Sequence, residues 1–430
     1  MKTNKLSKEW WLSFLNRNEN FTNTCTFHDA FVEQDVDHLT MGVQEVLYER
    51  INSGAFDKGF RLYSEGTELK TKKTTKLFAD NKPHENEDII SYCERLFDEK
   101  FGIIMNYNET YSDKLAIRVN EMITPLFELI GTPPLGFEIT VFVGNYGWTP
   151  LGIHTDGVGE NVIHFHLGPG NKTMYTWDKE TYEKLVGKDV YNNKNVEPLL
   201  EHANKWEFGP GDVYYMPWFE NHIGYSKDLS IGVTLWFRNC SNQKYASELL
   251  RIFRNQFMSK DKRIIPCQID YLNNDSTFDN FESMVSKYVP KEDPTLKDFL
   301  HEIYSDFKHC IASNGGWRYP PAIKSKDKNA KDDETDRYEN SVISIVKPFK
   351  ILHRNINDKT LLIYVRGSKL KLNYFKDLIE LIEILNTGQE VHVQDIIQKS
   401  GLSNDVICYF LGILEKNMGI RVVSEEFAIA

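Results

Sequence analysis

From Phe137 onward, the sequence changes from polar and helical stretches to short runs rich in β-branched and aromatic residues. The runs are FEITVFVG, VIHFHL, KTMYTW, DVYYMP and IGVTLWF, and Gly, Pro or Asn residues separate them. Runs of this length, bounded by turn residues, are typical of strands in an antiparallel sandwich or barrel. We therefore predict a β-rich core over residues 131–240 within an α+β chain.

The segments on either side of this core predict helices. Residues 1–130 carry short apolar-periodic segments, of which 112–130 is the longest before a glycine and two prolines end it. Pro125 lies inside that stretch and predicts a kink or a break. Residues 241–323 carry further helical patterns, which would cover the barrel or join two subunits of a homodimer.

A charge-dense segment separates the C-terminal part of the chain. The run KSKDKNAKDDETDR has no apolar residue larger than alanine, so we predict a solvated linker over 324–340. Residues 341–430 show strand patterns, three helical patterns and a closing strand. This order predicts a separate winged-helix-like domain.

Composition excludes several classes of function. The formal net charge of −11 disfavours a surface that collects phosphates, so we expect neither nucleic acid nor membrane as a partner. The start of the chain lacks the apolar core of a signal peptide, which predicts a cytoplasmic protein. The six cysteines form no Cys-x-x-Cys pair, so no disulfide framework or zinc cluster is expected.

Candidate metal ligands lie within the β-rich core. In the triplet His154–Thr155–Asp156, the two ligand residues alternate along an extended segment and therefore point to the same side. His222 supplies a third ligand. Two imidazoles and one carboxylate form the usual set for non-haem Fe(II). About one His-x-Asp triplet is expected by chance in a chain of this composition, so the surroundings must decide.

The surroundings support the triplet. Lys172 follows Gly170 and Asn171 at the start of an apolar strand, and a lysine aimed into a small barrel requires an anion. The distal carboxylate of 2-oxoglutarate would satisfy it. The turn Gly209–Asp212 and the strand after it lead to His222. The order of these residues is the one that a jelly-roll barrel needs to gather them at one end of its cavity.

With these residues, the sequence resembles the JmjC-type, cupin-like oxygenases that depend on Fe(II) and 2-oxoglutarate, among them protein asparaginyl and ribosomal-protein hydroxylases. The resemblance covers about Phe137–Asn239 and implies a double-stranded β-helix core. It implies that His154, Asp156 and His222 bind Fe(II), that Lys172 holds 2-oxoglutarate, and that O2 is the oxidant.

One position departs from the pattern of this family. Many relatives carry a threonine three residues before the first histidine to bind the co-substrate, and here that residue is Leu151. Thr149, Thr234 or a barrel tyrosine would have to replace it, and the sequence leaves this choice open. Arg238 lies too far along its strand to anchor the co-substrate, so Lys172 is preferred.

Two further histidines, His164 and His166, are two residues apart and would face the same side of a strand. Three alternatives remain for them. They are hydrogen-bonded cavity or core residues, they bind substrate or water, or they form a second metal site.

The C-terminal part has a resemblance of its own. With its Leu385–Asn386–Thr387–Gly388 and Asp395–Ile396–Ile397 segments, Leu370–Val423 resembles the PqqD-type peptide-recognition domains of ribosomal peptide modification, and less closely the winged-helix tail of ribosomal oxygenases. Lys416 is the only basic residue of the last predicted helix, which disfavours DNA reading. Peptide binding at a strand edge or packing in a dimer fits better.

Together these patterns predict an oxygenase that hydroxylates a peptide or protein side chain, with a ribosomally synthesised precursor peptide as the favoured substrate. The alternatives are an oxygenase for a ribosomal protein or a small molecule, and a cupin-like binding module without turnover.

Overall fold

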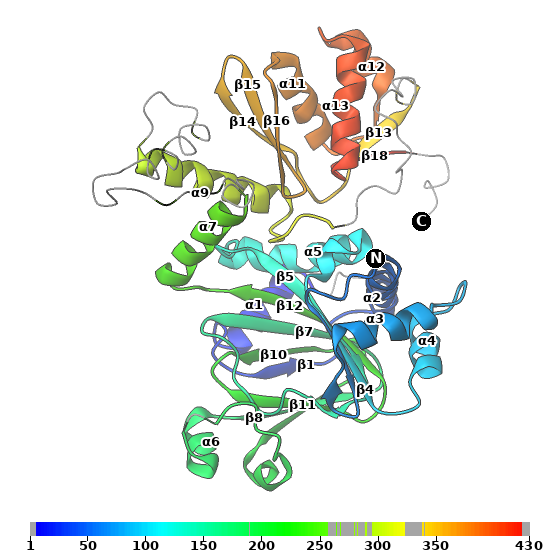
Figure 1. The fold of residues 1–430 in the computed structure, drawn as a ribbon, viewed down its shortest axis with the longest axis vertical. Helices are drawn as coiled ribbons and strands as arrows, with labels where there is room; N and C mark the ends of the chain where they lie inside the picture. Colours follow the sequence, from blue (N-terminus) through cyan, green and yellow to red (C-terminus); the bar gives the residue numbers. More distant parts are fainter. Residues whose placement is uncertain are drawn as a thin grey trace. The chain divides into compact units, whose positions relative to one another are not determined.

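The structure is a computed structural model that describes residues 6–188, 190–256, 295–322 and 340–423, with the single residues 264, 267, 279, 282, 289 and 338. The chain divides into two compact units, which are described separately (Figure 1). The first comprises Met1–Cys240 and Gly316–Lys326, and the second comprises Ser241–Gly315 and Asp327–Ala430. The linker predicted over 324–340 lies outside the described residues, apart from Tyr338 and Asn340.

The described residues of the first unit form two antiparallel sheets (Figure 1). The larger has the order β1-β10-β7-β12-β5-β4-β2-β3 and consists of β1 (Cys25–Phe27), β2 (Phe60–Ser64), β3 (Thr67–Glu68), β4 (Phe101–Met105), β5 (Phe137–Gly144), β7 (Glu160–Pro169), β10 (Val213–Pro217) and β12 (Ser230–Arg238). The smaller has the order β6-β11-β8-β9 and consists of β6 (Gly147–Trp148), β8 (Lys172–Trp177), β9 (Asn204–Phe208) and β11 (Asn221–Ser226).

All five runs that were predicted as strands form strands, namely β5, β7, β8, β10 and β12. Their pairing is antiparallel throughout, as predicted, and β12 lies between β5 and β7. Buried residues alternate or run continuously along these strands because both faces of the large sheet are covered over much of their length. This arrangement is consistent with the predicted jelly-roll, cupin-like core.

The region before the core is less purely helical than predicted. Its helices are α1 (Lys8–Arg17), α2 (Glu33–Ser53), α3 (Thr71–Asp80), α4 (Ile89–Leu96), the 3-10 turn η1 (Asn108–Thr110) and α5 (Asp113–Ile130). It also supplies β1 to β4, which extend the large sheet at both ends. Strand β4 is five residues long and buried at every position. A short apolar run without alternation does not distinguish a strand from a buried helical segment, which explains the incomplete prediction.

Helix α5 continues through Pro125 without a break. Proline removes one hydrogen bond of the helix, the one to the carbonyl of Glu121. Gly42 of α2 lies so close to α5 that a Cβ added there would be 2.9 Å from the Cβ of Leu115. The first turn of α5 therefore packs closely against α2.

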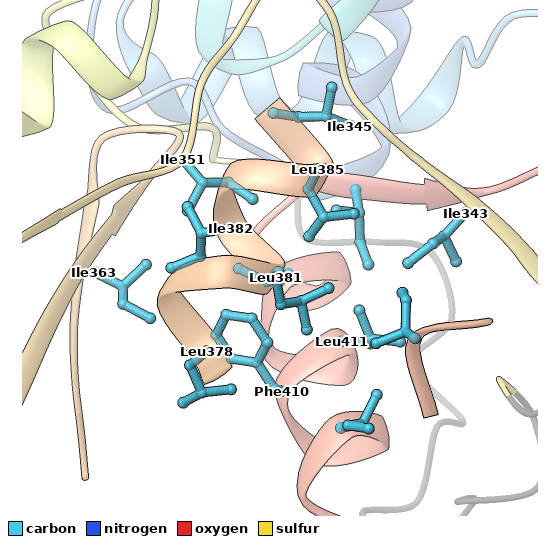
Figure 2. Packing of buried hydrophobic residues seen from close by; sticks show 14 of the residues in the cluster. Ile343, Ile345, Ile351, Ile363, Leu378, Leu381, Ile382, Leu385, Phe410 and Leu411 are labelled. Atoms are coloured by element: carbon cyan, nitrogen blue, oxygen red, sulfur yellow. The ribbon is translucent and has the colours of Figure 1, made fainter. Parts of the chain in front are cut away.

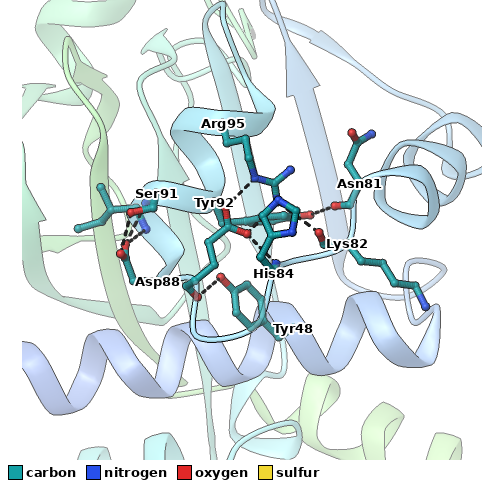
Figure 3. A network of polar contacts seen from close by, with 10 residues as sticks. Tyr48, Asn81, Lys82, His84, Asp88, Ser91, Tyr92 and Arg95 are labelled. Atoms are coloured by element: carbon teal, nitrogen blue, oxygen red, sulfur yellow. Dashed lines mark hydrogen bonds and ion pairs between the residues drawn. The ribbon is translucent and has the colours of Figure 1, made fainter.

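Polar contacts fasten α2 to the segment around α4 (Figure 3). The hydroxyl of Tyr48 on α2 donates to the carbonyl of Glu87 at 2.9 Å. Arg95 of α4 binds the carboxylate of Glu87 with Nε at 2.6 Å and Nη2 at 2.7 Å, and the Tyr92 hydroxyl donates to the carbonyl of Asn81 at 2.8 Å. Backbone carbonyls that would otherwise lack a partner are thus satisfied by long side chains.

In the residues that the structure describes, the second unit combines helices with two three-stranded antiparallel sheets. Its elements are α7 (Asn242–Gln256), α9 (Leu296–Ser313), β13 (Val342–Ile345), β14 (Leu352–Asn357), β15 (Thr360–Val365), β16 (Ser368–Asn373), α11 (Lys376–Asn386), β17 (Val391–His392), α12 (Val393–Lys399), α13 (Asn404–Lys416) and β18 (Ile420–Val422). Side chains of α11 and α13, such as Leu381, Leu385 and Phe410, meet in a buried apolar cluster (Figure 2). The winged-helix assignment of this region stays a prediction.

None of the described helices combines the length and the apolar character that crossing a membrane requires.

Candidate metal centre

The three predicted metal ligands converge at one point. A backbone bridge joins His154 to His222, with N–H to carbonyl distances of 3.2 and 2.8 Å. The backbone N–H of Asp156 donates to the carbonyl of Trp218 at 3.0 Å. One ligand atom from each of the three side chains lies within 4.8 Å of the others. This spacing and donor set fit a single divalent cation with open coordination positions.

Hydrogen bonds orient both imidazole rings toward this point. Nδ1 of His154 lies 2.8 Å from the carbonyl oxygen of Gly152, and Nδ1 of His222 lies 3.1 Å from that of Glu220. A carbonyl can only accept, so each Nδ1 carries the hydrogen and each Nε2 is left with a lone pair. Burial, together with the neighbouring His154, lowers the pKa of His222 to about 4. A neutral imidazole with a bare Nε2 is the form that binds a metal.

The turn before His154 allows no side chain at Gly152. This residue has a φ of +78°, and a Cβ there would lie 2.6 Å from the carbonyl oxygen of Asn192. The next residue, Ile153, exchanges backbone hydrogen bonds of 2.7 and 3.1 Å with Asn193. The segment that carries His154 is therefore held both by β11 and by the chain that connects β8 to β9, which includes α6 (Lys179–Val186) and η2 (Glu197–His202).

The glycine-rich turn before β10 is organised by Asp212. Its carboxylate accepts hydrogen bonds from the backbone of Gly209 at 2.8 Å and from that of Asp29 at 2.9 Å. This turn starts β10, which ends at Pro217, and the next strand carries His222. The turn Gly209–Asp212 thus has a structural role, because it directs the chain toward the third candidate ligand, His222.

A cavity of about 280 Å³ opens beside the triad, between the two sheets. The larger sheet contributes its inner residues and the smaller sheet contributes Lys172, Met174, Phe208, His222 and Gly224. The apolar part of the lining consists of Phe142, Leu151, Val162, Met174, Phe208, Met216 and Trp236. The cavity has the size and the mostly apolar character of a site for a small molecule.

Lys172 projects into this cavity and is only 6% exposed. Its Nζ donates to the hydroxyl of Tyr146 at 2.8 Å and lies 5.0 Å from the centre of the Phe142 ring. Within the described part of the chain, no carboxylate lies at ion-pair distance from it. Gly224 makes room for it, since a Cβ there would be 3.2 Å from the lysine Cε. A buried ammonium without a counter-charge requires an anionic ligand.

The two threonines predicted to contact the co-substrate both line the cavity, but their hydroxyl groups have protein partners. The Thr149 hydroxyl donates to the carbonyl of Gly224 at 3.0 Å. The Thr234 oxygen lies 3.1 Å from Nδ1 of His164. Their roles toward the co-substrate stay predictions. The Tyr146 hydroxyl accepts from Lys172, so its own hydrogen is available to a ligand.

His164 and His166 form a chain of hydrogen bonds. Nε2 of His166 donates to the carbonyl of Gly170 at 2.8 Å, and its Nδ1 lies 3.3 Å from Nε2 of His164. With both rings neutral, each proton position is fixed, and Nδ1 of His164 must accept from the Thr234 hydroxyl. The geometry favours the hydrogen-bonded alternative for these histidines over a second metal site. Thr234 then offers only lone pairs to the cavity.

Several polar residues at the site were not named from the sequence. Arg61 and Tyr214 line the cavity, and Tyr146 contacts Lys172. Tyr214 is buried, and its hydroxyl has no hydrogen-bond partner among the described residues. Desolvation by burial raises its pKa, so the phenol stays protonated and can donate. In sequence, a tyrosine or arginine within or beside an apolar strand is equally typical of core or surface, so no local signal marks Arg61, Tyr146 or Tyr214.

The two paired histidines predict an acid-sensitive structure. Burial lowers the pKa of His166 to about 4 and that of His164 well below its usual value, whereas both titrate near about 6.5 in an unfolded chain. Below pH 6.5 the unfolded chain therefore binds more protons, and stability that is complete above this pH is lost as pH falls toward 4. His166 alone should contribute up to about 3 kcal/mol.

Urea unfolding of the metal-free protein in EDTA, from pH 8 to pH 4, would measure this loss. The decrease in the free energy of unfolding between pH 8 and pH 4 should be smaller in His166→Gln than in the wild type. An equal pH dependence in the two proteins would contradict the assignment.

No protein-family model matches the chain, and no curated protein matches its sequence. Among solved structures, the chain is similar to a crystal structure of the Escherichia coli ribosomal oxygenase YcfD, with 13% identity and a TM-score of 0.48. The structure of the same protein in complex with cobalt and succinic acid has 12% sequence identity to this chain and a TM-score of 0.48. Its structure in complex with cobalt and 2-oxoglutarate has 13% identity and a TM-score of 0.45. Each comparison covers 96% of this chain and 98% of the other. At such low identity, the chemistry of this chain has to be judged from its own residues.

Proposed function

We propose that this chain is an Fe(II)- and 2-oxoglutarate-dependent oxygenase that hydroxylates a peptide or protein side chain. The observation that carries this proposal is the meeting of His154, Asp156 and His222 with the buried Lys172 in one cavity. A three-residue facial ligand set leaves coordination positions for a co-substrate and O2. A cation without a counter-charge in the same cavity supplies the site for the far carboxylate of that co-substrate.

Lys172 and Tyr146 would hold that carboxylate together. Nζ of Lys172 uses one of its three N–H groups on Tyr146, which leaves two, and the Tyr146 hydroxyl adds its own hydrogen. These donors match the lone pairs of one carboxylate. They also compensate for Leu151, which stands where many relatives have a threonine. Thr149 and Thr234 remain alternatives, although their hydrogen bonds within the protein favour Tyr146.

Bound iron would supply the oxidising chemistry, in which 2-oxoglutarate and O2 yield succinate, CO2 and one oxygen atom for a substrate C–H bond. The residues of the chain would position the reacting groups and exclude water from them. The Nδ1 hydrogen bonds of the two histidines fix the ligand directions. Val162, Met216 and Trp236 give the cavity an apolar wall that excludes water.

A ribosomally synthesised precursor peptide is the substrate class we favour, because residues 370–423 resemble peptide-recognition domains. A ribosomal protein is the second candidate. If the second unit captures the substrate, a peptide with its recognition segment should be modified faster than the same peptide without it.

Reconstitution under anaerobic conditions tests the proposed chemistry. The protein with Fe(II) and 2-oxoglutarate should release succinate after O2 is admitted, and EDTA should abolish the release. Binding of 2-oxoglutarate should depend on a divalent metal, with Mn(II) as a redox-inert substitute. A folded protein that binds 2-oxoglutarate neither with Fe(II) nor with Mn(II) would contradict the proposal.

A further inference from the structure

The cavity contains a second cation, Arg61, that the reaction proposed above does not use. Arg61 lies on β2 opposite Ile104 of β4, and Ile104 pairs in turn with Phe142 of β5. The ring of Phe142 lies beside Lys172. The two cations therefore belong to one cavity but come from different sheets, Arg61 from the larger and Lys172 from the smaller.

Arg61 differs from other arginines of the first unit in its partners. Arg50 is held by backbone carbonyls, Arg238 pairs with Glu160, and Arg318 lies 4.0 Å from Glu138. Arg61 lies near the hydroxyl of Tyr63 on its own strand, and that hydroxyl donates to the carboxylate of Glu68 at 3.3 Å. Across the described residues, no carboxylate is at ion-pair distance from its guanidinium, which is partly buried. Its charge is available to a ligand.

The backbone before Arg61 is fixed by other contacts. The buried guanidinium of Arg50 donates to the carbonyls of Ala55 at 3.3 Å and of Lys58 at 3.1 Å, and also to that of Asn106. The carbonyl of Gly59 accepts from the backbone N–H of Asn106 at 2.7 Å. The loop into β2 is thus tied to the end of β4. A binding group on a fixed strand loses little entropy when its ligand arrives.

Charge balance indicates what this ligand is. Among the described residues that line the cavity, Asp156 is the only carboxylate. A divalent ion, Lys172 and Arg61 together carry four positive charges, against one from Asp156 and two from 2-oxoglutarate. One positive charge remains unbalanced in a poorly solvated space, and a single further anion would neutralise it.

We propose that Arg61 binds a carboxylate of the substrate, so that the residue entering the cavity is an aspartate, a glutamate or a free chain end. This inference rests on the proposed function, since it assigns the substrate of the same site. A guanidinium binds a carboxylate through two parallel N–H bonds, which fixes the direction of the bound group as well as its position. Arg61 is in this respect a specificity-determining residue.

Three pools of labelled hexapeptides test the proposal against the protein loaded with Mn(II) and N-oxalylglycine, a non-reactive analogue of 2-oxoglutarate. The first pool has a central Asp or Glu and an amidated end, the second a central Asn or Gln and an amidated end, and the third a central Asn or Gln and a free carboxylate end. Fluorescence anisotropy gives the affinities for the wild type, for Arg61→Gln and for the control Lys58→Gln, which removes an exposed charge from the preceding loop.

We expect one carboxylate pool to bind at least about 10-fold more tightly than the amide pool, and the pool that does so identifies the source of the carboxylate. This preference should disappear in Arg61→Gln and persist in Lys58→Gln. Absence of any preference in the wild type, or its persistence in Arg61→Gln, overturns the proposal.

Calorimetric titration of the same proteins with N-oxalylglycine measures their affinity for the co-substrate analogue. It distinguishes a failure of the Arg61 assignment from a failure of the proposed function. If N-oxalylglycine does not bind to the wild type with Mn(II), the oxygenase proposal itself fails. If it binds to the wild type but about 10-fold more weakly to Arg61→Gln, Arg61 belongs to the co-substrate site and the substrate assignment is overturned.

Discussion

Replacing His154 with alanine should lower the affinity of the chain for Fe(II) or Mn(II) by about 100-fold or more, because even loss of a residue that only orients a ligand costs 10- to 100-fold. The side chain supplies one of three ligand atoms that lie within 4.8 Å of one another. It is also held in the metal-binding orientation by the carbonyl of Gly152. Without it, two ligands remain, and succinate release should fall with metal occupancy.

Equilibrium dialysis against Mn(II) under anaerobic conditions measures this loss directly. His202→Ala is a matched control, because it removes an exposed histidine of η2 outside the cavity. Circular dichroism establishes that both variants remain folded. If His154→Ala and His202→Ala bind the metal equally well, the metal centre proposed here is wrong.

The sequence was sufficient to predict five strands of the core, but not β6, β9 and β11 of the smaller sheet. The run FEITVFVG forms β5 from its first residue to its last, and KTMYTW forms β8 in the same way. Both runs are bounded by residues that end a strand, so local information determines their limits. The three candidate ligands were also predictable, because alternation along an extended chain puts His154 and Asp156 on one side.

Partners far apart in sequence were not predictable. Arg61 reaches the cavity because β2 joins the large sheet through β4, and no local pattern shows that pairing. Tyr146 becomes a candidate ligand for the co-substrate only because its hydroxyl lies 2.8 Å from Nζ of Lys172. The direction of the Thr234 hydroxyl depends on the tautomers of His164 and His166. The carbonyl of Gly170, which accepts from His166, fixes both tautomers. Each of these features comes from tertiary contacts rather than from composition or spacing.

Substitution of Lys172 with methionine should have opposite effects on co-substrate binding and on stability. Loss of the charged donor should weaken 2-oxoglutarate binding by about 10- to 100-fold, since each hydrogen bond to a charged group contributes about 1.5–3 kcal/mol. The protein without ligand should be at least as stable as the wild type, because a buried ammonium without a counter-charge is replaced by an apolar side chain of similar length.

The remaining donors can be ranked in the same calorimetric titration of 2-oxoglutarate with Mn(II). Tyr146→Phe should weaken binding by about 10-fold, whereas Thr234→Val should change it less than about 3-fold, because the threonine hydrogen is directed to His164. Lys172→Arg should not restore affinity, since a longer, planar guanidinium would have to displace the Tyr146 hydroxyl, which lies 2.8 Å from the lysine Nζ. A larger loss in Thr234→Val than in Tyr146→Phe would reverse the assignment of the second donor and would require the opposite proton positions along the His164–His166 chain.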